Sequence, residues 1–249
     1  MLAINPFAAL SASIAPAVLQ AYVILMIVLV AAGTLFDMVH KGSAKYFFQN
    51  WRRSRGKAQQ VSGGELASIA VQTAVVDVLA SGEFCNMRRR IAHLLTMYGF
   101  VIHAVATIAM VFGASTGDLW PRLWWIGGLM VLAGGYWFWF FIRVDVAAEG
   151  SSPFRLMRAD LFVVSLLASV TLGLAWAWFG SMILFWLYII ASTVLFGSVP
   201  WSKFAHMFFK PAAAFEKRVS NANGTRANLP APADKPEQFG TRVKHARNY

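Results

Sequence analysis

Five long apolar stretches that contain no Asp, Glu, Lys or Arg limit this chain to one class of structure. They cover residues 17–36, 91–112, 123–142, 161–179 and 182–199. An α-helix needs about 20 mostly apolar residues to cross the hydrocarbon core of a bilayer. A soluble protein would also need a charged surface, yet only 13% of the 249 residues are charged. The pattern predicts an all-α integral membrane protein with a bundle of five transmembrane helices.

Basic residues are unevenly distributed among the connections between these predicted spans. Nine of the 22 Lys and Arg residues lie between the first and second spans, three between the third and fourth, and nine after the fifth. The remaining one, Arg122, lies on the opposite side. Because cytoplasmic loops are rich in Lys and Arg, we expect a periplasmic, or exoplasmic, N-terminus and a cytoplasmic C-terminus. The net charge of +11 then faces lipid headgroups and protein partners, and gives no reason to expect nucleic acid.

The predicted organisation is a transmembrane bundle over residues 1–220, followed by a basic cytoplasmic tail over residues 221–249. The bundle includes a cytoplasmic connection over residues 37–90, in which residues 66–80 are apolar. That segment is too short to span and contains Asp77, so we expect a helix on the cytoplasmic surface or against a partner. The tail mixes Pro, Asn, Lys and Arg without periodicity, which predicts disorder.

Tryptophans lie near the ends of the predicted spans. They are Trp120, Trp124, Trp125, Trp176, Trp178 and Trp201. Because tryptophan is enriched at membrane–water interfaces, we expect interface anchors in preference to a ligand-binding group.

Histidines are the candidate ligands for a redox centre, because the single cysteine, Cys85, cannot hold an iron–sulfur cluster. His93 and His103 lie ten residues apart in the second span, about 15 Å along the axis, and both can face the interior of one bundle. His206 follows Pro200, and we expect it on a continuation of the fifth helix. His93 and His206 would then reach one depth from two helices, as the axial ligands of a b-type haem do.

Neighbouring residues leave two interpretations of this histidine pair open. Arg88, Arg89 and Arg90 directly precede His93, and guanidinium groups pair well with haem propionates. The alternative is that His93 and His206, both close to basic residues, are simply headgroup-level side chains without a ligand.

The layout resembles the cytochrome b type gamma subunit of respiratory nitrate reductase. The shared features are five spans, two histidines ten residues apart in the second, and a histidine at the inner end of the fifth. The resemblance implies that His93 and His206 hold an inner haem b and that His103 matches an outer haem ligand. The position expected for its partner, 18 residues before His206, is Tyr188. Tyrosine departs from the family pattern, so His103 and Tyr188 mark either a quinone site or a second haem site.

Two longer strings resemble the membrane anchor associated with dissimilatory adenylylsulfate reductase in sulfur-oxidising bacteria. They are GGELASIAVQTAVVDVLASGEFCNMRRRIAHLLTMYGF, residues 63–100, and VPWSKFAHMFFKPAAAF, residues 199–215. The resemblance implies an electron-transfer subunit that links a cytoplasmic flavin and iron–sulfur enzyme to the quinone pool in sulfur oxidation. Such a subunit is either non-catalytic or reacts only with quinone, and no residue is assigned as a catalytic acid or base.

Two other functions were weighed against this one. A haem-free anchor would only tether the soluble enzyme to the membrane. For the electron-transfer subunit, residues 51–57, the arginine triplet and the tail form the expected basic docking surface for the cytoplasmic redox partner. A small transporter is disfavoured, because the spans lack the charged residues and paired helix breaks of that class.

The basic asymmetry predicts the result of a topology experiment. Reporter fusions placed after Lys57 and after Asn221 should both be cytoplasmic, because both positions lie in basic segments. Alkaline phosphatase activity indicates a periplasmic fusion, and fluorescence of a cytoplasmic reporter indicates a cytoplasmic one. A periplasmic fusion at Asn221 combined with a cytoplasmic one at Lys57 would mean that residues 66–80 cross the membrane.

Overall fold

The computed structural model describes residues 2–40, 49, 52, 61–82, 84, 86–113, 117–145, 150, 152–157, 160–202 and 206–224, without the side chains of residues 206–209. Every regular element in this part of the chain is helical. The elements are α1 (Pro6–Ala9), η1 (Leu10–Ala12), α2 (Pro16–His40), α4 (Gly63–Gln72), η2 (Thr73–Leu79), α5 (Met87–Val111), α6 (Leu119–Trp137), η3 (Phe138–Ile142), α7 (Leu161–Phe179), α8 (Met182–Gly197), η5 (Val199–Trp201) and α9 (His206–Ala222).

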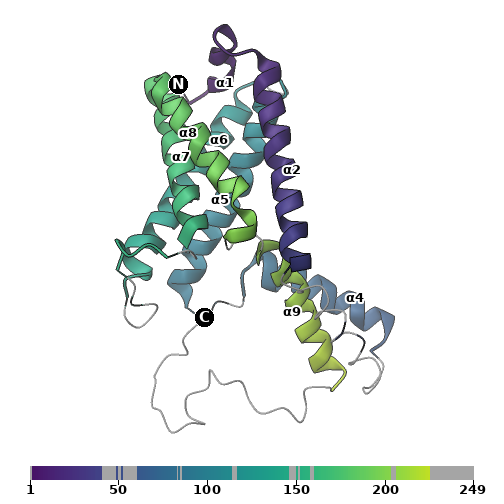
Figure 1. The fold of residues 1–249 in the computed structure, drawn as a ribbon. Helices are drawn as coiled ribbons and strands as arrows, with labels where there is room; N and C mark the ends of the chain where they lie inside the picture. Colours follow the sequence, from purple (N-terminus) through teal and green to yellow (C-terminus); the bar gives the residue numbers. More distant parts are fainter. Residues whose placement is uncertain are drawn as a thin grey trace.

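Four helices are long and apolar enough to cross a membrane: α2, α5, α6 with η3, and α7. They coincide with the first four predicted spans to within a few residues. The fifth, α8, is apolar but has 16 residues, which corresponds to about 24 Å and is shorter than the roughly 30 Å hydrocarbon core. It packs beside α7 and α2 in the same bundle (Figure 1). A fifth crossing therefore stays a prediction.

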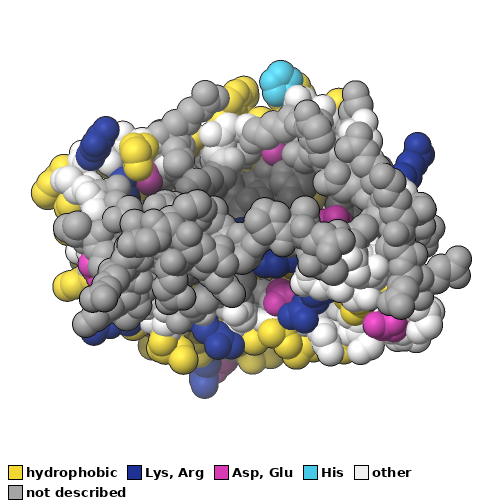
Figure 2. All heavy atoms as spheres, turned by 90° about the horizontal axis from the view of Figure 1, so that it is seen from below, with side chains coloured by type: hydrophobic (Ala, Val, Ile, Leu, Met, Phe, Trp, Pro, Cys, Tyr) yellow, Lys and Arg dark blue, Asp and Glu magenta, His cyan; other side chains and the backbone are white. Residues whose placement is uncertain are grey.

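The bundle has two ends, which differ in charge. The upper end in Figure 1 carries α1 and the connections α5–α6 and α7–α8, and the lower end carries α4 and α9. Arg122 is in the first turn of α6, at the upper end, whereas the arginine triplet begins α5 at the lower end. Seen from below, Lys and Arg side chains are spread over the lower face together with acidic ones (Figure 2). The sequence assigns this end to the cytoplasm, and that orientation stays a prediction.

Glycines allow α5 and α6 to pack backbone against backbone. A Cβ atom on Gly127 would lie 2.6 Å from the backbone nitrogen of His103 and 2.7 Å from the carbonyl oxygen of Gly99. A Cβ on Gly134 would lie 2.6 Å from the carbonyl oxygen of Ala92. Small residues at such interfaces let membrane helices gain van der Waals contact over their whole length. This contact fixes the position of α5, which carries His93 and His103.

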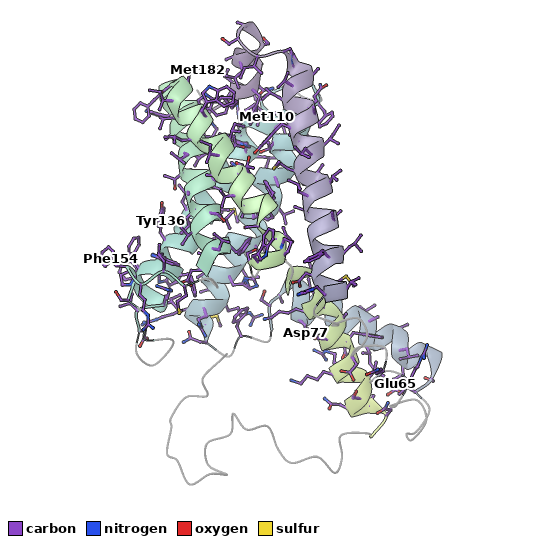
Figure 3. The ribbon with its side chains drawn as sticks, viewed as in Figure 1. Glu65, Asp77, Met110, Tyr136, Phe154 and Met182 are labelled. Atoms are coloured by element: carbon purple, nitrogen blue, oxygen red, sulfur yellow. The ribbon has the colours of Figure 1, made fainter. Side chains whose placement is uncertain are left out.

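The N-terminal segment closes the upper end of the bundle. The Phe7 ring of α1 lies between Trp124, at 6.1 Å, and Trp176, at 5.2 Å between ring centroids. Asn5 caps α1 with its side chain and donates from Nδ2 to the carbonyl oxygen of Met110 at 3.2 Å. Met110 is labelled near this end in Figure 3. The upper core is therefore built around an aromatic side chain that precedes the first span.

Three tryptophans differ from the sequence prediction. Trp124, Trp125 and Trp176 are 0%, 8% and 3% exposed, so they are core residues and the prediction of interface anchors is wrong for them. Their burial follows from contact with α1 and with one another. Trp178 and Trp201 are exposed, as an anchor requires.

The predicted surface segment forms one continuous helix, α4 followed by the wider π-helical turns of η2. It packs against α9, where Arg218 donates to both carboxylate oxygens of Asp77, at 2.7 and 3.0 Å, and to Oε1 of Gln72 at 3.2 Å. This bonding raises the pKa of the Arg218 guanidinium above its usual range. The prediction of a helix is confirmed, and its packing partner is α9 of the same chain. That this helix does not cross the membrane stays a prediction.

The fifth helix does not continue to His206. α8 ends at Gly197, η5 follows, and Ser202 is extended before α9 begins. The expectation of a continuous helix is wrong, because Val199 and Pro200 turn the chain where they pack against Gly33 of α2. Tyr188 and His206 therefore do not lie on one continuous helix, and their spacing of 18 residues does not place them on one helix face.

The predicted boundary between bundle and tail also shifts. Residue 221 lies inside the last turn of α9, which ends at Ala222. Most of the predicted disordered tail, residues 225–249, lies outside the described residues, as do residues 41–60 except 49 and 52.

The close α5–α6 contact predicts a large cost for one added methyl group. Gly127→Ala should lower the unfolding free energy in detergent by about 1–3 kcal/mol, because the methyl group would overlap the backbone of α5. Gly197→Ala is the matched control, since a Cβ there meets no atom within 4 Å. Thermal or denaturant unfolding of the purified protein measures both. Equal stability of the two variants would show that the helices are not in backbone contact.

Candidate functional site

The sequence-predicted haem ligands lie at the lower end, where α5 and α9 approach each other. His93 is half-buried on the second turn of α5, with its ring edge against Phe84 at a centroid distance of 4.9 Å. Lys210 of α9 places Nζ 5.7 Å from the centroid of the same Phe84 ring. Phe84 therefore joins the two helices that carry His93 and His206.

His206 is the first residue of α9, and its side chain lies outside the described part of the chain. Lys210 follows it by four residues, which places the two on the same face of an α-helix. The contact of Lys210 with Phe84 therefore links the first turns of α9 to the ring that packs on His93. Among the described residues, no three or more His, Cys, Asp or Glu side chains form a group that could hold a metal ion.

The three predicted propionate partners have different environments. Arg88 is exposed and Arg89 is half-buried in the first turn of α5, where Asn86 caps their backbone N–H groups at 2.9 and 3.4 Å. Arg90 is half-buried and donates from Nε to the carbonyl oxygen of Ala80 at 2.8 Å. Arg90 therefore ties η2 to the bundle, and the other two side chains remain at the surface.

His103 is buried between α5 and α6. Its Nδ1 lies 2.9 Å from the carbonyl oxygen of Trp124, and its ring stacks on the Trp124 ring at 4.7 Å. A carbonyl oxygen can only accept, so Nδ1 carries the proton and Nε2 holds the lone pair in the neutral ring. Histidines that bind metals are commonly oriented by such a second hydrogen bond. The local geometry is therefore compatible with ligation through Nε2.

Tyr188 is buried on α8. Its ring stacks on Trp176 at 6.0 Å and packs against Gly173, and its hydroxyl is hydrogen-bonded to Ser192. The ring contacts that connect Tyr188 to His103 run through Trp176, Phe7 and Trp124. The two residues proposed from sequence as one site are thus joined through an aromatic chain.

A group of hydroxyl side chains in the bundle was missed from the sequence. The Tyr22 hydroxyl of α2 donates to the carbonyl oxygen of Ile189 at 3.1 Å and lies 3.0 Å from Oγ1 of Thr193. Ser192 and Ser169 are hydrogen-bonded at 2.7 Å between α8 and α7. We call Tyr22, Ser169, Tyr188, Ser192 and Thr193 the hydroxyl cluster. The spacing of Tyr188, Ser192 and Thr193 on one helix was the signal that could have revealed it.

Asp37 is a buried carboxylate that the sequence analysis also missed. It is 2% exposed, because α2 extends four residues beyond the charge-free stretch and keeps this side chain inside. Thr34, one turn earlier, is buried too, and its Oγ1 has no hydrogen-bond partner. Ionisable residues at membrane depth usually have a function, which makes Asp37 a candidate for mutation.

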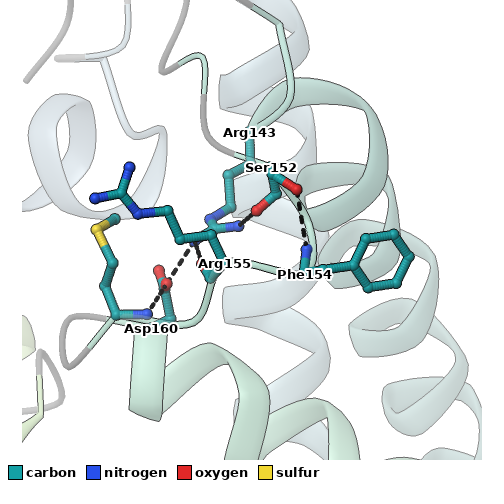
Figure 4. A network of polar contacts seen from close by, with 6 residues as sticks. Arg143, Ser152, Phe154, Arg155 and Asp160 are labelled. Atoms are coloured by element: carbon teal, nitrogen blue, oxygen red, sulfur yellow. Dashed lines mark hydrogen bonds and ion pairs between the residues drawn. The ribbon is translucent and has the colours of Figure 1, made fainter.

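Arg143 is fully buried and organises the connection between η3 and α7. Its guanidinium donates to Asp160 Oδ2 at 2.5 Å and to the carbonyl oxygens of Ser152 and Arg155 at 2.7 and 2.8 Å (Figure 4). It also lies 4.2 Å from the ring centroid of Trp139. These contacts compensate the cost of burying the charge, so the role of Arg143 is structural.

No protein-family model matches this chain, and no curated protein or solved structure matches it significantly. The resemblance to the adenylylsulfate reductase anchor and to the nitrate reductase gamma subunit therefore stays a prediction from the quoted residues.

The buried ion pair predicts a strong effect of Arg143. Arg143→Met should lower the unfolding free energy by about 3–5 kcal/mol, because it leaves the Asp160 carboxylate without its partner. Arg122→Met breaks an exposed pair with Asp118 and should cost about 1 kcal/mol or less. Unfolding in detergent compares the two variants. Similar losses in both would contradict a structural role of the buried pair.

Proposed function

We propose that this chain is the membrane anchor and electron-transfer subunit of a cytoplasmic flavin and iron–sulfur reductase, with adenylylsulfate reductase as the candidate enzyme. One observation carries the proposal: Phe84 contacts both His93 on α5 and Lys210 on α9. This contact brings two histidine-bearing helices together at the basic end of the bundle. Two imidazoles from two helices are the axial ligands of a b-type haem.

The donor set is suitable for haem b. His93 and His206 are the proposed axial ligands, and Arg88, which is exposed, and Arg89, which is half-buried, are the proposed partners of the propionates at the same end. Phe84 lies between the two helices, so its ring has to move aside for a porphyrin. When bound, the haem supplies the one-electron step between the soluble partner and quinone.

The proposed quinone site uses His103, Tyr188 and the rest of the hydroxyl cluster. A quinone presents two carbonyl oxygens, for which the hydroxyl groups of the cluster are donors in an otherwise apolar site. The Nε2 lone pair of His103 can accept a hydrogen bond from a hydroxyl of the quinol that forms on reduction. The Tyr22 hydroxyl bonds to Thr193 at the exposed edge of the cluster, so a quinone arriving from the lipid would meet it first. The protein then orients the quinone, while haem supplies the electrons.

Docking of the soluble partner is proposed at the lower end. Arg88 and Lys217 are exposed there, and opposite charges steer association between redox partners. Of the other basic segments proposed from sequence, residues 51–57 apart from Arg52 and residues 225–249 lie outside the described residues.

A haem-free anchor is the second candidate function, and the same contact supports it. With Phe84 packed between His93 and Lys210, the lower end is joined by protein side chains alone. Arg90 is likewise engaged with the backbone of Ala80. In this case the chain only tethers the soluble enzyme to the membrane.

A reduced-minus-oxidised absorption spectrum of the purified protein tests the haem proposal. His93→Ala and His206→Ala should each abolish a reduced b-type band, because each removes one axial ligand. His40→Ala is the matched control, since His40 is an exposed histidine at the end of α2 that stacks on Phe36 at 5.3 Å. His103→Ala should leave the band in place while slowing quinone reduction.

Haem quantification separates the alternatives. About one haem per chain supports the proposal, and a haem-free wild-type protein would contradict it and favour the tether. Two haems per chain, with loss of one in His103→Ala, would instead assign His103 to a second haem site.

A further inference from the structure

The α4–η2 helix exposes an apolar face. Val71, Val75 and Leu79 are 63%, 51% and 50% exposed, and their spacing of four residues places them on one side of the helix. We call these three residues the valine face. Val76, 42% exposed, lies beside it. Side chains of this size are seldom left in water as a contiguous row unless something covers them.

The opposite side of the same helix is occupied by α9. Ile69 and Thr73 are buried there, and Asp77 is held by Arg218. The valine face therefore points away from α9, and the polar and charged contacts gather on the other side. This division of apolar and polar sides is typical of a helix that lies in a membrane interface.

Two hydrogen bonds set the depth of the helix relative to the bundle. The Tyr98 hydroxyl donates to the carbonyl oxygen of Leu79 at 2.7 Å, and Arg90 donates to that of Ala80. Tyr98 lies seven residues into the apolar stretch 91–112 of α5, about 10 Å along its axis. The end of η2 is thus held beside the membrane-spanning part of α5.

Neighbouring apolar surface continues in the same region. Leu35, Phe36 and Val39 are exposed at the lower end of α2. The α4–η2 helix projects sideways from this end, with α9 below it (Figure 1). Asp77 lies close to the foot of α2, and Glu65 lies at the far tip of α4 (Figure 3). A bilayer that surrounds α2 therefore reaches the helix.

We infer that the valine face binds lipid, at the boundary between headgroups and acyl chains, with α9 on the aqueous side. The face is one side of a single helix and not a groove for a partner helix, and exposed apolar side chains of α2 lie at the same end of the bundle. Exposed Arg88 and Lys217 at the same end favour anionic headgroups. The inference requires neither haem nor a protein partner.

Site-directed spin labelling of the full-length protein, reconstituted alone, tests this inference. Cys85→Ser provides a cysteine-free background, and nitroxides are attached to Val71→Cys or Val75→Cys. Glu65→Cys is the matched control, because Glu65 is exposed on the same helix and lines the groove beside Arg218. Collision rates with oxygen, which concentrates in lipid, and with a nickel chelate, which stays in water, report the surroundings.

The labels on the valine face should collide several-fold less with the nickel chelate than the Glu65 label, and more with oxygen. Vesicles with and without phosphatidylglycerol extend the test. The difference in nickel collision rate between the valine-face labels and the Glu65 label should be larger in the anionic vesicles. Equal access of nickel at both positions would overturn the inference and leave the face available to a protein partner. Protection from both reagents would also overturn it, because protein would then cover the face.

Discussion

The arrangement of this protein depends on a constraint of the bilayer: backbone polar groups have no water to bond with and must be satisfied within helices. Attraction between such helices comes from close contact, which glycines permit. The close approach of Gly127 to the backbone of His103 is an example of such contact. It also brings the His103 imidazole to the Trp124 carbonyl, so a packing feature determines which ring nitrogen carries the proton.

The same constraint explains where the polar side chains lie. In the hydroxyl cluster, Tyr22 and Ser169 bond across helix boundaries to residues of α8. Arg143 meets Asp160 and two backbone carbonyls within one connection. Asp37 is held inside near the lower end of α2. Such polar contacts fix the relative position of the elements that they join, whereas apolar packing alone would permit several positions.

Charge-free stretches made the long helices predictable, because their length and composition are local properties. Features that depend on distant contacts were missed or wrongly predicted. Trp124 and Trp176 are buried by Phe7, which no local pattern indicates. Arg218 pairs with Asp77 across 141 positions, and the end of α8 reflects packing of Pro200 on Gly33. The prediction that His93 and His206 share one depth relied on a continuous fifth helix, whereas α9 begins as a separate helix after α8 and η5.

The break between α8 and α9 has a mechanical consequence. His93 belongs to the rigid bundle, whereas α9 is held by the α4–η2 helix through the Arg218 pair and by the Phe84 contact. A group that binds residues of both the bundle and α9 would hold these two parts together. Its binding free energy would add to the stability of the lower end, by thermodynamic linkage. Binding of such a group and stabilisation of the lower end would then be a single assembly step.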